Sequence, residues 1–274
     1  MPLCFFQFNV LLSKAISLKL IKKNFLNDFA GAWIFFTIFP KLPLILPRFK
    51  NITQYAPLLG IFIGYIQSLI FISLRNNSWP IFASASICIA SGFLITGGLH
   101  IDGLMDTFDG LYAGKDKFIK AMKDSRVGAF GVQAIILITL IQLASLMKIE
   151  DKIFHVLPIC LFWGRVSTLI YIDKFKYFNY KRKSFSHQKY WRGLNKESRL
   201  SILILILLGL YNLTVSDSYI FIFKRLTLLV LGFIFAWRIP ILIGRKTGGV
   251  NGDTCGASVV LTETVMLFIY AIVL

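Results

Sequence analysis

Apolar residues in this chain fall into runs about as long as a bilayer is thick, roughly 20 residues each. Such runs predict transmembrane helices, because a helix satisfies its own backbone polar groups inside the hydrocarbon. Seven spans are predicted, at residues 55–74, 80–99, 129–147, 153–172, 200–215, 226–243 and 257–274. The run at 200–215 is short for a span, so we expect neighbouring residues such as Arg199 to complete it by reaching toward the interface.

An eighth apolar run, at residues 29–46, contains Pro40 and Pro43 with Lys41 between them. Proline interrupts a helix, and a lysine inside the hydrocarbon is costly. This run therefore predicts a broken or re-entrant helix. The expected fold is all-α, a polytopic membrane helix bundle with about seven full spans plus this N-terminal helix. No linker or repeat divides the chain, so residues 1–274 are expected to form one integral membrane domain.

Basic residues are concentrated in three of the predicted loops. The loop at 100–128 has five lysines or arginines, the loop at 173–199 has nine, and the loop at 244–256 has two. These loops follow alternate spans and share one side of the membrane, which the positive-inside rule identifies as cytoplasmic. Residues 1–28 carry four lysines and are predicted to be a basic amphipathic lead-in, which lies on the same side if residues 29–46 are re-entrant.

Composition agrees with a membrane protein, since 56% of the residues are hydrophobic and 16% are charged. The net charge of +17 could suggest nucleic-acid binding. Because the basic residues gather in loops on one side, we instead expect them to face anionic lipid, with the lipid bilayer as a partner and no nucleic acid. The four cysteines include no Cys-x-x-Cys pair, so neither a disulfide framework nor a zinc site is predicted.

The most informative polar segment is GGLHIDGLMDTFDG, at residues 97–110. Asp102, Asp106 and Asp109 have the spacing i, i+4, i+7, which places three carboxylates on one helix face. Like charges repel at this spacing, so a divalent cation is the expected counterion, and Mg2+ commonly combines carboxylates with substrate phosphates. The alternative is an acidic helix cap with solvated charges. His100 adjoins this face and is predicted to orient substrate rather than to bind metal.

A second segment, MKDSRVGAFG, occupies residues 122–131. Ser125 is a candidate N-cap for the span that follows. A helix start with exposed amides, together with Arg126, suits phosphate oxygens. We therefore predict that Asp124, Ser125 and Arg126 belong to a phosphate-binding loop. The alternative is an ordinary basic loop that ends in a helix cap.

A third segment, GGVNGDTCGA, occupies residues 248–257 at another cytoplasmic span boundary. It could add a fourth carboxylate, Asp253, to the same metal site, although alone it would indicate only a turn. Two charged residues also lie inside predicted spans, Arg165 and Glu263. A charge at that depth is costly and therefore indicates function. Arg165 is expected to meet phosphate or a carboxylate; either residue could instead be half of a structural ion pair.

These segments together resemble the cobalamin synthase family, whose members are also called adenosylcobinamide-GDP ribazoletransferases. The resemblance rests on residues 97–110, 122–131 and GDTCGA at 252–257. The stretch FFTIFPKLP, which ends at Pro43, and the pair Gly164-Arg165 are also similar to that family. The matching segments occur in order from about residue 33 to residue 265.

The resemblance implies an activity. Members of this family join adenosylcobinamide-GDP to alpha-ribazole or its 5'-phosphate, release GMP and complete the nucleotide loop of cobalamin. They require magnesium and reside in the cytoplasmic (inner) membrane. This implies that Asp102, Asp106 and Asp109 hold the metal and act in catalysis, with Asp109 as one candidate acceptor of the hydroxyl proton.

Two departures from the family pattern stand out. Three positions before Glu263, where the family commonly has a second acidic residue, this chain has Val260. The Gly-Leu-Gly pattern expected in the loop before the sixth span is absent from residues 179–187. We therefore expect fewer acidic groups for metal or substrate near Glu263. We also expect that loop to contact the incoming nucleoside differently, or not at all.

Two other functions remain open from the sequence. A CDP-alcohol phosphotransferase also uses clustered aspartates on a membrane helix, but its Asp-Gly is followed by Ala-Arg, whereas Asp102-Gly103 is followed by Leu104-Met105. A transporter could use Arg165 and the aspartates for ion coupling. Against it, the acidic cluster lies at a cytoplasmic boundary and the two halves of the chain do not repeat.

Overall fold

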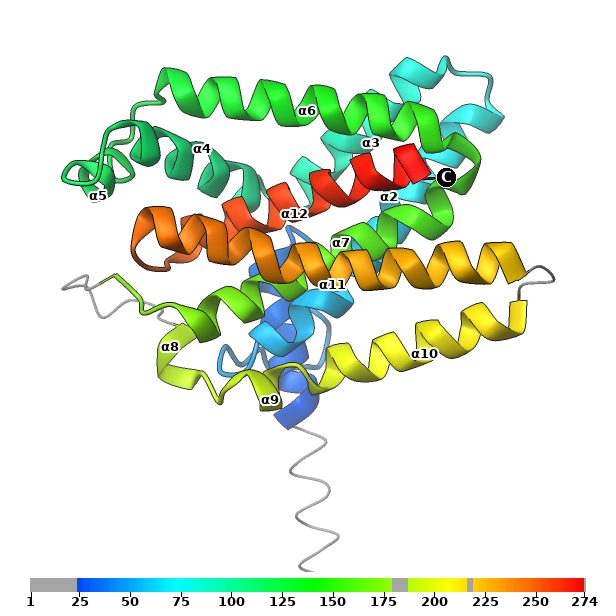
Figure 1. Cartoon of the computed structure of the whole chain (residues 1–274). Helices are drawn as coiled ribbons and strands as arrows, with labels where there is room; N and C mark the ends of the chain where they lie inside the picture. Colours follow the sequence, from blue (N-terminus) through cyan, green and yellow to red (C-terminus); the bar gives the residue numbers. More distant parts are fainter. Residues whose placement is uncertain (1–23, 179–186, 216–218, 274) are drawn as a thin grey trace, which may run out of the picture.

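The computed structural model describes residues 24–178, 187–215 and 219–273, and these ranges are almost entirely helical. The longest helices form one bundle, in which several of them run side by side (Figure 1). They are α2 (Ala56–Asn76), α3 (Ile81–Ile95), α4 (Leu99–Tyr112), α6 (Ala129–Ile149), α7 (Ile153–Lys174), α10 (Arg199–Val215), α11 (Tyr219–Thr247) and α12 (Gly252–Val273). Short helices complete the chain: η1 (Thr53–Tyr55), α5 (Phe118–Ala121), η2 (Glu150–Lys152), α8 (His187–Tyr190) and α9 (Leu194–Glu197).

The predicted all-α polytopic bundle is confirmed, but with a different inventory of spans. Within the described residues, five helices are long and apolar enough to cross a membrane, and they come from α2, α6, α7, α11 and α12. Helices α3 and α4 form a bent pair that could make a sixth span. In α10, whose described side chains end at Leu210, the stretch Arg199–Leu210 is a shorter apolar helix. Of the seven predicted spans, five are thus found at full length within the described residues, the run at 80–99 is broken, and the run at 200–215 is described only in part.

The break between α3 and α4 is caused by two glycines. Gly97 and Gly98 have φ angles of +60° and +73°, in the left-handed region that other residues avoid. The Gly98 amide donates to the Phe93 carbonyl and the Gly97 amide donates to that of Leu94, which is the Schellman pattern of a helix end. Helix α4 then leaves at 90° to α3. The turn sets the direction of the helix that carries the aspartates.

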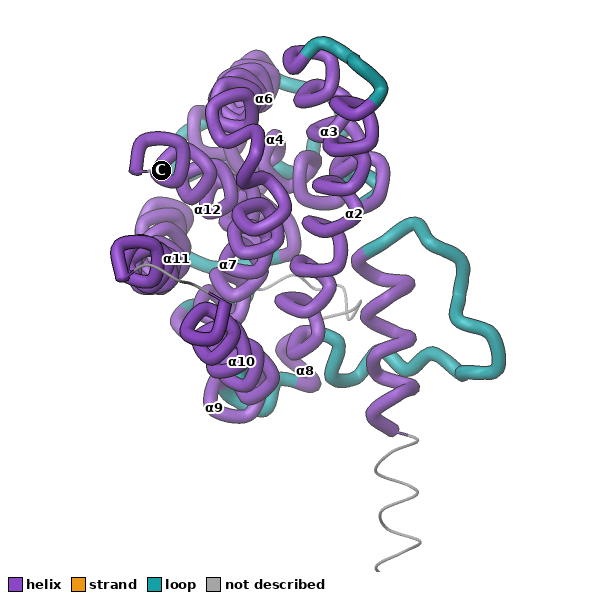
Figure 2. The backbone as a smooth tube through the Cα atoms, turned by 90° about the vertical axis from the view of Figure 1, so that its right-hand side faces the viewer, coloured by secondary structure: helices purple, strands orange, loops and turns teal. Residues whose placement is uncertain are grey.

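The N-terminal helix covers residues 24–36; it runs crosswise to the long helices in Figure 1 and stands beside the bundle in Figure 2. No helix follows between residues 37 and 52, as the two prolines predict. Buried Asp28 accepts hydrogen bonds from Arg48, at 2.5 Å, and from Asn51. The two ends of this broken segment therefore lie together, as a re-entrant helix requires. Most of the predicted lead-in, residues 1–23, lies outside the described residues.

Helix α7 occupies the centre of the bundle, where it packs against α2, α11 and α12 (Figure 2). Small residues allow the closest approaches. A Cβ at Gly64 of α2 would lie 2.5 Å from the Cα of Pro158, and one at Gly60 would lie 2.5 Å from the Leu161 carbonyl oxygen. This close contact places the buried middle of α7, including Arg165, beside α2.

Helix α4 packs along the first turns of α12, again through glycine. A Cβ on Gly103 would lie 2.6 Å from the carbonyl oxygen of Asp253, and one on Gly256 would lie 3.1 Å from that of His100. The backbones therefore approach more closely than larger residues allow. This contact places two of the predicted segments, 97–110 and 248–257, directly against each other.

Gly103→Ala should therefore lower stability. The added methyl group has to displace the backbone at Asp253, and such overpacking typically costs about 1–3 kcal/mol. Gly209→Ala in α10 is the matched control, because a Cβ there meets open space, and alanine favours a helix by up to about 1 kcal/mol. Thermal unfolding of both variants in detergent checks this. An equal or higher melting temperature for Gly103→Ala would contradict the close packing.

Candidate acidic site

Helix α4 presents its carboxylates at one end of the bundle. Asp102 is exposed, whereas Asp106 and Asp109 are half-buried. The carboxylate of Asp106 lies within electrostatic range of those of Asp102, Asp109 and Asp253. The structure therefore brings together the four acidic residues that the sequence assigned to one site.

Asp109 has a further role, because it caps α6. Its two carboxylate oxygens accept hydrogen bonds from the Gly128 amide, at 2.8 Å, and from the Gly131 amide, at 2.7 Å. Both glycines touch the carboxylate so closely that a Cβ would collide with it. A carboxylate at a helix N-terminus satisfies free amides and favours the helix dipole. Asp109 therefore holds the start of α6, and with it the predicted phosphate-binding loop that precedes this helix, against α4.

This capping arrangement corrects one prediction. Ser125 is not the N-cap of α6, because the helix begins at Ala129 and its N-cap is Gly128. The capping oxygen comes from Asp109, 19 residues earlier in the chain, which spacing rules for local caps cannot detect. Ser125 instead lies in the exposed loop before the helix.

The same loop holds Asp124 and Arg126 in an exposed ion pair. The Arg126 Nη2 and Nε donate to the two oxygens of Asp124 at 2.7 and 3.0 Å, and the Arg126 amide also donates to Asp124. These hydrogen bonds lower the pKa of Asp124 to about 2. The Arg126 side chain remains 87% exposed, so one face of the guanidinium stays open to solvent and to ligands.

Asp253 stands in the first turn of α12, which begins five residues earlier than the predicted span. Asn251 explains the early start: its Oδ1 accepts from the Thr254 amide at 2.8 Å, while its own amide donates to the Thr254 hydroxyl at 2.9 Å. The sequence carries this N-cap signal as Asn followed by Gly-Asp-Thr, although the predicted span begins only at residue 257. Asn251 Nδ2 also donates to Asp253 at 2.7 Å and fixes that carboxylate.

A short backbone bridge holds the turn before α12. The Val250 amide donates to the Lys176 carbonyl at 3.0 Å, and the Phe178 amide donates to the Val250 carbonyl at 3.1 Å. The loop after α7 is thereby joined to the turn that presents Asp253. The rest of that loop, residues 179–186, lies outside the described residues, so the prediction about its missing glycine pattern stays a prediction.

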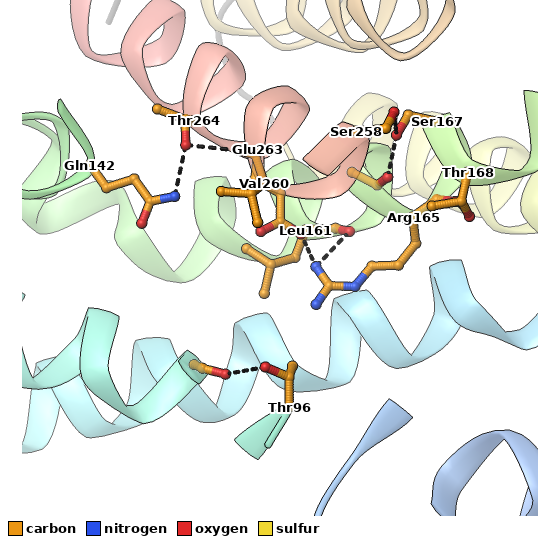
Figure 3. A network of polar contacts seen from close by, with 12 residues as sticks. Thr96, Gln142, Leu161, Arg165, Ser167, Thr168, Ser258, Val260, Glu263 and Thr264 are labelled. Carbon is orange, nitrogen blue, oxygen red and sulfur yellow. Dashed lines mark hydrogen bonds and ion pairs between the residues drawn. The ribbon is translucent and has the colours of Figure 1, made fainter. Parts of the chain in front are cut away.

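Arg165 and Glu263 form an ion pair in the middle of the bundle (Figure 3). Arg165 is 4% exposed and also donates to the Leu161 carbonyl at 3.2 Å. Gly164 makes room for the partner, because a Cβ there would lie 2.5 Å from the Glu263 Cγ. The sequence left phosphate contact and ion pairing both open for Arg165, and the structure places Arg165 against a carboxylate.

A small cavity of about 50 Å3, with both polar and apolar walls, adjoins this pair. His100 lines it together with Gln67, Gln142 and Thr96, so His100 turns into the bundle and away from solvent. Gln142 donates to the Thr264 hydroxyl at 2.8 Å (Figure 3), whereas the Gln67 Oε1 has no partner in the described part of the chain. The cavity is large enough for more than one water molecule.

An open cleft of about 610 Å3 lies beside Asp102. One wall is the turn at residues 96–98 with the start of α4, and the other is Phe35, Thr37 and Ile38. The Ile38 amide donates to the Ile95 carbonyl at 2.9 Å, which holds the N-terminal segment against the broken helix. The FFTIFPKLP stretch thus borders the cleft that reaches the acidic face of α4.

The charge of this site is not balanced by the described side chains. Across residues 24–178, 187–215 and 219–273, no lysine or arginine forms an ion pair with Asp102, Asp106, Asp109 or Asp253. In the same ranges, no three histidine, cysteine, aspartate or glutamate side chains converge closely enough to hold a metal ion by themselves. The oxygen donors present are therefore near one another but would need further ligands to complete a coordination shell.

The fold and this site define a multi-pass helical membrane protein with an acidic centre at one end of the bundle. A sequence model of the cobalamin-5-phosphate synthase family matches residues 28–271, and the chain belongs to this family. The match covers all three segments that suggested the resemblance.

Individual relatives agree. A Prochlorococcus marinus protein named adenosylcobinamide-GDP ribazoletransferase is 44% identical over 92% of this chain and 97% of its own length. Proteins with the same name from Synechococcus elongatus and Alkaliphilus oremlandii are 31% and 29% identical, over 88% and 84% of this chain and 94% and 92% of their own lengths. No solved structure matches the chain.

Proposed function

We propose that this protein transfers the adenosylcobinamide-phosphate group of adenosylcobinamide-GDP to alpha-ribazole or its 5'-phosphate, and that GMP is released. A ribose hydroxyl attacks the diphosphate phosphorus on the corrinoid side. The new phosphorus–oxygen bond forms as the bond to GMP breaks, GMP keeps the electron pair, and the hydroxyl proton passes to a base. Such a reaction needs positioning and charge stabilisation more than covalent help from the protein.

The packing of α4 on α12 is the observation that carries this proposal. The Gly103 contact brings Asp253 alongside Asp102 and Asp106, so segments 150 residues apart supply one acidic centre. The cleft of about 610 Å3 leads to Asp102 and offers space for a diphosphate. The names of the relatives supply the reaction, and the geometry offers a place for it.

Magnesium is the proposed cofactor, and the donor set suits it. Four carboxylates without ion-paired cations favour a hard divalent ion, and magnesium often takes only one or two carboxylates, with water and substrate phosphate completing its shell. One or two of Asp102, Asp106 and Asp253 would hold it, with Asp109 at the edge of the set. Bound there, magnesium would neutralise charge on the diphosphate and on leaving GMP.

The remaining groups have separate roles in this proposal. Asp106 lies between the other carboxylates and is the proposed acceptor of the hydroxyl proton. Asp109 holds the loop of Asp124, Ser125 and Arg126 against α4 through the two amides of α6. The open face of Arg126 is positioned to grip a phosphate oxygen of the nucleotide. His100 supports the first turn of α4 from inside the bundle and is proposed to orient the substrate through that turn.

The experiment that tests this function uses purified membranes. Adenosylcobinamide-GDP, alpha-ribazole and magnesium are incubated with membranes that contain the protein, and GMP and the completed corrinoid are quantified together. Equal amounts of both products are expected, with none when magnesium is chelated. Uptake of labelled substrate into vesicles without GMP release would instead identify a transporter.

We further propose that the protein resides in the cytoplasmic membrane with the acidic centre on the cytoplasmic side. Single-cysteine variants near Lys22 and at Lys117 should resist a membrane-impermeant maleimide in intact cells, because basic segments stay inside. A cysteine at Asn77, in the turn between α2 and α3, is the control and should be labelled. Labelling near Lys22 would mean that residues 24–52 cross the membrane completely.

A further inference from the structure

A second cleft runs along α12 between α4 and α11 and is separate from the acidic centre. It encloses about 650 Å3, and its walls are mostly apolar. In Figure 1, α12 lies between these two helices. The lining comes from all three, with Phe108, Leu111, Ile239, Leu242, Leu261 and Val265 as its main apolar residues. Leu242 is 57% exposed, so the cleft opens to the surroundings of the bundle.

One end of this cleft is basic. It continues into a pocket of about 220 Å3, and Lys115 and Lys246 line both spaces. Arg245 lines the smaller pocket as well. None of these three cations forms an ion pair within the described residues. The cleft therefore has an uncompensated positive end and an apolar body.

The basic pocket also offers room for a ligand close to the backbone. Gly114 and Gly248 both line it, with φ angles of +86° and +79°. At each of them a Cβ would meet nothing within 4 Å. An anionic group of phosphate size could therefore approach these segments without displacing a side chain.

The acidic face of α4 points away from this cleft. At 100° per residue, Thr107, Phe108 and Leu111 are centred roughly 180° around the helix from the aspartates. The cleft is thus distinct from the proposed reaction site. Its ligand does not need to be a substrate of the reaction.

The length of the cleft favours a lipid over a soluble nucleotide. On α11 its lining runs from Lys246 to Ile239, which corresponds to about 10 Å of helix, and on α12 it reaches Val265, 13 residues from the start of that helix. Both stretches belong to helices apolar enough to cross a membrane. A nucleoside phosphate could occupy the basic end but would leave the apolar body unfilled, whereas an acyl chain matches it in length and polarity.

We propose that this cleft binds one anionic phospholipid. The phosphate lies between Lys115 and Lys246, with Arg245 nearby, and one acyl chain extends along α12 toward Val265. Two basic groups at one end match the negative headgroup, since each lysine or arginine near a membrane surface attracts anionic lipid by about 1 kcal/mol. The bound lipid would fill the space that α4, α11 and α12 enclose and would hold α4 against the other two helices.

The test uses the purified full chain in detergent micelles, titrated with dioleoylphosphatidylglycerol and, separately, with dioleoylphosphatidylcholine. Phosphatidylglycerol is expected to bind more tightly and to raise the melting temperature more. Lys115→Gln/Lys246→Gln should weaken its binding about 25-fold, or about fivefold for each lysine. Lys148→Gln, an exposed lysine at the far end of α6, is the matched control and should bind normally.

Leu242→Trp supplies the second arm, because this exposed position can accept a larger side chain that fills the cleft without removing charge. It should weaken binding of phosphatidylglycerol by at least tenfold. Equal binding of the two lipids, or unchanged binding by the double lysine variant, would overturn the proposal. Competition by inorganic phosphate or GMP at low millimolar concentration, with no effect of Leu242→Trp, would also overturn it and assign the basic pocket to a soluble phosphate.

Discussion

Asp106→Asn is expected to reduce the rate of GMP release by about a thousandfold while the protein still inserts and folds. Asp106 lies within electrostatic range of the three other carboxylates, so its loss breaks the acidic centre whichever neighbour shares the metal. The substitution keeps the shape of the side chain and removes only its charge. Loss of one preorganised group that stabilises developing charge commonly costs 100- to 1,000-fold in rate, and loss of the proposed base adds to that.

Asp116→Asn is the matched control, because Asp116 is exposed in the loop between α4 and α5 and is not part of the acidic centre. Turnover is measured across a magnesium titration, and melting temperatures are compared in detergent. The control should retain normal turnover. Near-normal activity of Asp106→Asn at saturating magnesium would show that Asp106 neither holds the metal nor accepts the hydroxyl proton.

The second large effect is expected from Glu263→Gln, which leaves Arg165 buried without its counter-charge. Removing one partner of a buried ion pair typically costs about 3–5 kcal/mol, because the remaining charge stays desolvated. The melting temperature in detergent should fall sharply, and the yield of folded protein in membranes should fall with it. A melting temperature within a degree of the unsubstituted protein would show that the pair does not stabilise the bundle.

The double variant Arg165→Met/Glu263→Leu separates structure from catalysis. Replacing both charges with apolar groups removes the desolvation penalty, so most of the lost stability should return. If Arg165 serves only as an ion-pair partner, activity returns together with stability. If Arg165 also contacts the diphosphate, the double variant folds but stays slow, and Arg165→Lys lowers kcat/KM for the GDP-corrinoid because lysine lacks the planar fork.

Local rules predicted the parts of the site that depend on neighbours in the chain. The i, i+4, i+7 spacing placed Asp102, Asp106 and Asp109 on α4, and the prolines at 40 and 43 predicted the broken N-terminal segment. Segment 248–257, at a predicted span boundary, suggested Asp253 as a fourth carboxylate. Each of these inferences needed only helix periodicity or a single residue type.

The parts that the sequence could not give depend on contacts between distant segments. Asp109 caps α6 across 19 residues, and no local pattern distinguishes such a cap from a metal ligand. Arg165 pairs with Glu263 across 98 residues, and hydropathy reports only that both charges are costly. The break at Gly97 and Gly98 was hidden by the apolar residues on either side, because hydropathy averages do not register left-handed glycines.

The ion pair between Arg165 and Glu263 also has a consequence for how the chain is made. The ribosome delivers α7 well before α12, so the arginine enters the bilayer 98 residues ahead of the carboxylate that neutralises it. Until α12 arrives, α7 carries a lone cation that favours water over lipid. The centre of the bundle can therefore close only when translation reaches α12. A chain truncated before that helix would leave an unneutralised charge in the membrane.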